Sequence, residues 1–132
     1  MRIVIAYIAT AVAFLAIDSV WLSTMASRLY RPYLGDLLRS DFDVKAAALF
    51  YIIYVGGIVY FAVMPALSSG SWRVAALNGA ILGLVAYATY DLTNQATLRE
   101  WPTIITVADL CWGTFLTASS ATVAYLITSR FA

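Results

Sequence analysis

The stretch AAALFYIIYVGGIVYFAVMPALSS, residues 46–69, decides the fold because it carries no charged side chain. A helix needs about 20 mostly apolar residues to cross the hydrocarbon core of a bilayer. Residues 3–27, 74–98 and 102–129 share this pattern, and each stretch is interrupted by one aspartate. We therefore predict an all-α integral membrane protein, in which a single domain, residues 1–132, forms a bundle of four spanning helices.

Composition supports lipid as the solvent of this chain. Hydrophobic residues make up 63% of the sequence and charged residues 11%, whereas soluble domains are about half apolar and a quarter charged. The apolar runs are continuous and much longer than the alternating segments of about ten residues in membrane barrels. A net charge of +1 offers no basic surface for nucleic acid. We expect a multi-pass protein that has no nucleic-acid partner.

The side chains that bind most metals and cofactors are scarce. The chain has no histidine and one cysteine, Cys111. Histidine-ligated haem, zinc–histidine sites and histidine general bases are thereby excluded. No phosphate-binding glycine loop and no metal-ligand spacing is present. The sequence predicts no cofactor and no metal, and it leaves open whether the protein is an enzyme.

Three aspartates occupy a similar depth in three of the predicted helices. Asp18, Asp91 and Asp109 each lie roughly 10–15 Å, at about 1.5 Å per residue, from a span end on the side of the long loop, residues 28–45. A charged residue inside a membrane costs about 2.5–3.5 kcal/mol and usually serves a function. We therefore predict that the three carboxyl groups meet in one site.

Aromatic and amide side chains accompany these acids. Each aspartate has a tryptophan or asparagine three residues later, on the same helix face, and tyrosines lie near the same level in the second and third spans. Such groups form a pocket with apolar walls and a few polar atoms. The predicted substrate- or proton-binding residues are Asp18, Trp21, Tyr54, Tyr87, Asp91, Asn94, Asp109 and Trp112. Tyr51 enters from the same end of the second span as Tyr54.

The chemistry of this pocket favours binding or transport of a small or amphipathic molecule. Burial and like charge oppose the ionisation of all three acids, so we predict that at least one is protonated at neutral pH and that transport is proton-coupled. One alternative is a membrane enzyme that acts on a lipid-like substrate by carboxyl acid–base chemistry. Another is an accessory subunit of a larger membrane complex, in which the polar residues only join helices.

Small residues indicate where helices pack closely. Gly79 and Gly83 form a small-x-x-x-small pair, which is typical of close helix contact. This contact is either within the chain or in a homodimer. The expected partners are thus the lipid bilayer, a small or lipid-like ligand, and either a second copy or a larger membrane complex.

Four short motifs resemble a known family. They are DSVWL at residues 18–22, YDLTN at 90–94, WP at 101–102 and DLCWG at 109–113. Together they resemble the bacterial membrane-protein family called domain of unknown function 2177, over essentially the whole chain. The resemblance implies four spans and a location in the bacterial inner membrane. It implies no established activity.

Overall fold

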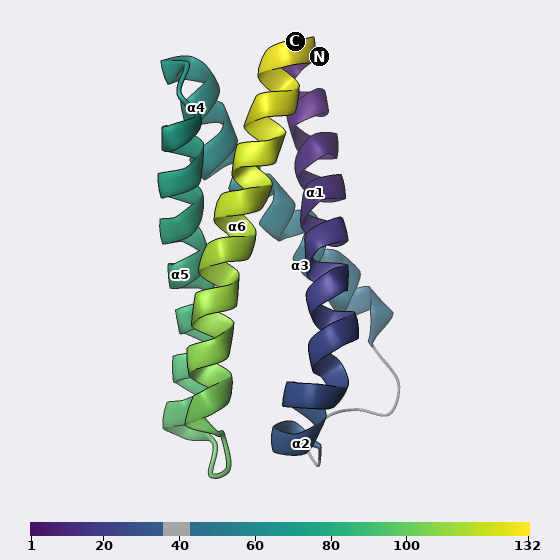
Figure 1. The fold of residues 1–132 in the computed structure, drawn as a ribbon, viewed down its shortest axis with the longest axis vertical. Coiled ribbons are helices and arrows are strands. Elements are labelled where there is room, and N and C mark those ends of the chain that lie inside the picture. The colour runs from purple at the N-terminus through teal and green to yellow at the C-terminus, as the bar shows by residue number, and fades with distance from the viewer. Residues whose placement is uncertain (36–42) are drawn as a thin grey trace.

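The first quarter of the chain is one long, bent helical unit. The structure, a computed structural model, describes residues 1–35 and 43–132. Helix α1 (Arg2–Met25) continues through a π-helical segment, η1 (Ala26–Tyr30), into the short helix α2 (Arg31–Leu34). The predicted span ends near residue 27, whereas the helix continues for two more turns. In Figure 1 the chain bends at the lower end of α1 and carries α2 toward the lower end of α6.

Three further helical units complete the bundle. Helix α3 (Val44–Ile58) continues through a second π-helical segment, η2 (Val59–Val63), into α4 (Met64–Ser69), and α5 (Trp72–Thr97) and α6 (Thr103–Phe131) follow. All regular elements in the described part of the chain are helices, and four of the continuous units are long and apolar enough to cross a membrane. The all-α, four-span fold class is therefore confirmed. Figure 1 places both termini at the same end of the bundle, as an even number of spans requires.

Both π-helical segments end shortly before a proline. Pro32 follows η1 and Pro65 follows η2. A proline in a helix has no N–H to donate, and its ring displaces the carbonyl four residues earlier. The helix is wider at this point, because the N–H of Met64 bonds to the carbonyl of Val59, five residues back rather than four. Prolines and π-bulges are the usual causes of helix bends, so these two residue positions explain why the first two units are not straight.

The third unit satisfies the backbone carbonyl that Pro65 leaves without its usual partner. This carbonyl belongs to Phe61, and the side-chain amide of Asn78 in α5 donates to it with a nitrogen–oxygen distance of 3.0 Å. Lipid offers no water to replace a lost backbone hydrogen bond. The η2–α4 bend and α5 are therefore coupled by one interhelical contact.

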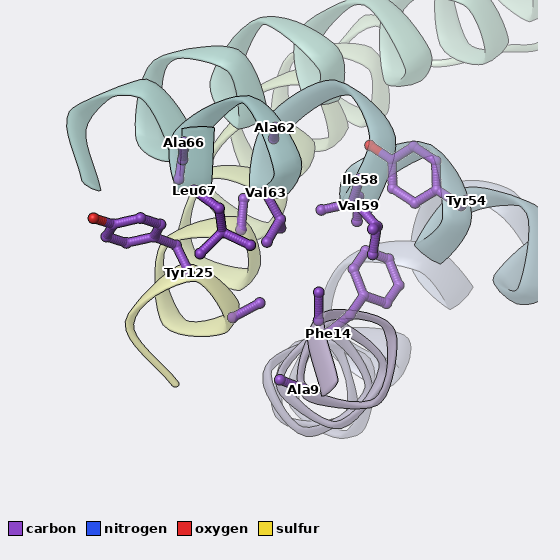
Figure 2. Close-up of a cluster of buried hydrophobic side chains, with 14 of the residues drawn as sticks. Ala9, Phe14, Tyr54, Ile58, Val59, Ala62, Val63, Ala66, Leu67 and Tyr125 are labelled. Carbon is purple, nitrogen blue, oxygen red and sulfur yellow. The ribbon is translucent and has the colours of Figure 1, made fainter. Parts of the chain in front are cut away.

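The core lies between α1, the second unit and α6. Figure 2 shows Phe14 of α1 facing Tyr54, Ile58 and Val59 of the second unit. Phe14 and Ile58 are completely buried, whereas Ile53, on the outer side of the same unit, is 64% exposed. Such large apolar side chains directed outward suit a surface that lipid covers.

Glycines let α5 approach α6 until the backbones touch. A Cβ atom added at Gly79 would lie 2.8 Å from the carbonyl oxygen of Thr117, and one added at Gly83 would lie 2.1 Å from that of Gly113. Gly79 and Gly83 thus pack against α6 of the same chain. Of the two alternatives left by the sequence, a contact within the chain or in a homodimer, the structure shows the first. The face that these glycines form is occupied by α6.

The contact between Asn78 and Phe61 makes a double-mutant cycle possible. Asn78→Leu should lower the free energy of unfolding by about 1 kcal/mol, the usual size of an interhelical hydrogen bond in a membrane. In a Pro65→Ala background the restored N–H of residue 65 can bond to Phe61 itself, so the same change should cost less than half as much. Reversible unfolding in mixed micelles with sodium dodecyl sulfate measures both values. Equal losses in the two backgrounds would contradict the coupling.

Two glycine substitutions test the backbone contact between α5 and α6. Gly83→Ala should destabilise the protein by about 2–3 kcal/mol, because the new methyl group meets backbone atoms that cannot move independently. Gly57→Ala is the matched control, since nothing lies within 4 Å of a Cβ atom there. It should be neutral or stabilising by up to about 1 kcal/mol, because alanine favours a helix over glycine. The same unfolding measurement applies, and a similar effect at both positions would refute the contact.

Candidate functional site

Asp18 joins three of the four helical units. This side chain of α1 is 8% exposed, and its carboxyl group accepts two hydrogen bonds. One comes from the hydroxyl of Tyr51 in α3, at 2.8 Å, and the other from the indole N–H of Trp112 in α6, at 3.1 Å. Two donors from different helices hold α1, α3 and α6 in register.

The two tryptophans of the Asp-x-x-Trp motifs stack on each other. The ring centroids of Trp21 and Trp112 are 4.4 Å apart, and the ring planes differ by 9°. Each tryptophan is linked by hydrogen bonds to the aspartate of the other helix. Trp112, three residues after Asp109, donates to Asp18, and Trp21, three residues after Asp18, is connected to Asp109 through one tyrosine. The two motifs therefore form one connected unit.

Tyr30 is that connecting residue, and sequence reasoning missed it. Its hydroxyl accepts a hydrogen bond of 2.9 Å from the indole N–H of Trp21 and donates one to the carboxyl group of Asp109. Tyr30 is the last residue of η1, and it falls in the stretch 28–45 that the sequence assigned to the long loop. The signal was present in Pro32, which suits the first turn of a helix and permits a helical start at Arg31.

Asp91 lies behind Asp109 and has no donor of its own. It is completely buried in α5, and neither of its oxygens accepts a hydrogen bond from a donor group in the described part of the chain. Its carboxyl group instead interacts with the carboxyl group of Asp109 within hydrogen-bonding reach. A carboxylate only accepts hydrogen bonds, so this contact becomes a hydrogen bond only when one of the two acids carries a proton.

A cavity of about 360 Å³ opens beside this network. All four helical units contribute to its wall. The cavity lies at the level of α3, which packs against α1, whereas the later segments η2 and α4 pack against α5. The lining residues are Asp18, Trp21, Leu22, Tyr30, Phe50, Tyr51, Ala86, Tyr87, Tyr90, Asp109 and Trp112. None of these described residues is basic.

Five of the eight predicted site residues line the cavity, and three lie outside its wall. Asp91 stands behind Asp109, as described above. Tyr54 bonds to the hydroxyl of Thr117, with 2.7 Å between the two oxygens, and its ring meets that of Tyr87 edge-on at 6.4 Å. Asn94 lies one turn beyond the cavity, four residues after Tyr90 in the same helix. These residues support the wall from behind.

The position of Tyr87 depends on a glycine across the helix interface. A Cβ atom at Gly113 of α6 would come within 2.2 Å of the Tyr87 ring. Glycine at this position lets the ring lie flat against the backbone of α6.

Two lining residues that sequence reasoning did not select stand close to ones that it did. Leu22 follows Asp18 by four positions, and Tyr90 follows Tyr87 by three. Helical neighbours at these spacings share a face, so both could have been predicted.

The described residues offer little to a metal ion. Among residues 1–35 and 43–132, no three side chains of the histidine, cysteine, aspartate or glutamate type converge as metal ligands would. The two carboxyl groups in the cavity wall are instead held by tyrosine and tryptophan donors. The arrangement is suited to a ligand that meets acids and aromatic faces together.

Comparison with known proteins supports the resemblance seen in the sequence. A model of the family described as "Predicted membrane protein (DUF2177)" matches residues 3–126. A search of curated proteins and a search of solved structures each give no significant match. The matched range includes the whole hydrogen-bond network and every residue of the cavity wall. Four spanning helices and a family match over nearly its full length show that this chain belongs to the DUF2177 family of membrane proteins.

Proposed function

We propose that this protein binds a small or amphipathic molecule in the cavity and transports it across the cytoplasmic membrane of a bacterium. The observation that carries this proposal is the cavity itself, where two carboxyl groups and several aromatic rings from all four helical units converge. Ligand sites are typically concave and mostly apolar, with a few polar groups that orient the ligand. A volume of about 360 Å³ suits a small organic molecule.

A purely structural role explains Asp18 better than it explains Asp91. Asp18 receives donors from two other helices, which is how buried polar residues join membrane helices. Asp91 receives no hydrogen bond from a donor group in the described part of the chain. A buried acid with no such donor weakens a bundle, so its presence supports a functional role.

We infer that Asp91 and Asp109 share one proton. Their carboxyl groups interact directly, and two buried carboxylates in contact would repel each other strongly. Asp109 lines the cavity while Asp91 does not, so a ligand that enters can disturb the pair from one side only. A proton held in this way can leave when a ligand binds, which is the basis of proton-coupled transport.

The same pair supports a second candidate function. A proton shared at the edge of a cavity can be passed to a bound molecule and recovered, as general acid–base catalysis requires. Under this alternative the protein is an enzyme that acts on a lipid-like substrate. A deletion strain would then show an altered lipid profile, whereas a carrier would change the uptake or export of a solute.

Infrared spectroscopy of the lipid-reconstituted protein tests the shared proton. We expect a protonated-carboxyl band at neutral pH that disappears at alkaline pH, when the pair loses its proton. Asp91→Asn should abolish the band, because an amide can donate to Asp109 and leave that carboxylate ionised. Glu100→Gln is the control, because Glu100 is exposed between α5 and α6. A spectrum that lacks the band in the wild type would rule out the pair as a proton store.

Cysteine labelling tests whether water and small molecules reach the cavity. Maleimides react with the thiolate, so labelling inside the membrane requires local water. In a Cys111→Ser background, Ala86→Cys should react with N-ethylmaleimide because Ala86 lines the cavity. Val85→Cys should react at least tenfold more slowly, since Val85 is 57% exposed on the outer, lipid-facing side at the same depth. Equal rates at the two positions would contradict an accessible cavity.

A further inference from the structure

We propose that the ligand of this cavity is an organic ammonium cation, with alkyl or aromatic substituents on the nitrogen. The inference rests on the proposed function and names the class of molecule that the same site takes. It follows from three features of the cavity wall: its charge, its aromatic content and the position of its opening.

The wall is acidic, and the described residues that form it supply no counterion. Asp18 accepts two hydrogen bonds and Asp109 accepts one from Tyr30, while no basic side chain is among the described residues that line the cavity. Hydrogen bonds from neutral donors stabilise a buried carboxylate, yet they leave its charge in place. A buried charge without a partner is costly, so a positively charged ligand complements this site better than a neutral or anionic one.

The remaining wall is unusually rich in aromatic rings. Seven of the eleven lining residues are tryptophan, tyrosine or phenylalanine. The face of such a ring attracts cations, most strongly when the site excludes water, and aromatic cages recognise quaternary ammonium groups in this way. Alkyl substituents on nitrogen also bury apolar surface against these rings. Charge and apolar contact therefore favour the same ligand.

The size and the rim of the cavity select an organic cation. A volume of about 360 Å³ is far larger than a metal ion needs, and no three side chains of the histidine, cysteine, aspartate or glutamate type converge in the described part of the chain. Exposed apolar side chains from three helices form the rim: Leu22 is 41%, Phe50 48% and Tyr90 61% exposed. A molecule with an apolar portion can rest on this rim while its ammonium group reaches the two carboxyl groups.

Two sources could supply an alkylated ammonium group: a free amphipathic cation or the choline headgroup of a lipid. A phospholipid would also bring a phosphate close to Asp18 and Asp109, and the described lining offers no basic side chain to receive that phosphate. We therefore favour a free cation, and the experiment below separates the two sources.

Calorimetric titration of the purified full-length protein in a neutral maltoside detergent tests the proposal. The probes are benzyltrimethylammonium and its uncharged carbon isostere neopentylbenzene, with the heat of transfer into empty micelles subtracted. We expect the cation to bind at least tenfold more tightly than the isostere. Asp18→Asn should weaken binding of the cation at least tenfold, and Glu100→Gln, which removes a charge outside the cavity, should leave binding unchanged.

The outcomes separate this inference from the proposed function. Equal binding of the two probes by the wild type would overturn the ammonium assignment and leave a cavity for amphipathic molecules in place. That comparison needs no variant, so it holds even if Asp18→Asn fails to fold. Binding of neither probe, together with maleimide labelling at residue 86, would also reject the ammonium ligand alone. Loss of cation binding after phosphatidylcholine is added would identify a lipid headgroup as the source, and unchanged binding a free cation.

Discussion

The pairing of Asp18 with donors from two other helices is the interaction on which the rest of the site depends. Without water in the membrane interior, a buried acid must find its hydrogen-bond partners within the protein. Tyr51 of α3 and Trp112 of α6 provide them. Because Trp112 is held by this bond, it presents its face to Trp21, and Trp21 in turn directs Tyr30 toward Asp109. One acid thus orients both halves of the cavity wall.

The general design of the fold was predictable because it depends on quantities that are local in sequence. Apolar length and the rarity of charge determine where a chain crosses a membrane. The prediction that the three aspartates lie at a similar depth came from counting residues along helices of known rise. The structure places Asp91 beside Asp109 and Asp18 in the same cavity wall as Asp109.

Other features of the site depend on the rotation and bending of helices, which a hydropathy pattern does not contain. Tyr30 reaches Asp109 only because the π-helical segment η1 and Pro32 extend and bend the first unit. The tryptophan of each Asp-x-x-Trp motif is connected to the aspartate of the other motif. This arrangement depends on how α1 and α6 face each other. Whether Asp91 lines the cavity or stands behind Asp109 is decided by the close approach of α5 to α6. Gly79 and Gly83 predicted a close helix contact, but the sequence did not identify α6 as the partner helix.

The hydrogen bond from Asn78 to the carbonyl of Phe61 has a consequence for how the protein is made. During synthesis the second span leaves the ribosome before the third, so the Phe61 carbonyl lacks the hydrogen bond from Asn78 until α5 follows. The second span is complete only when the third lies beside it. Gly70, in the left-handed conformation at φ 70°, closes the turn between them within a few residues. The two spans therefore reach their final structure only when they pair as a hairpin.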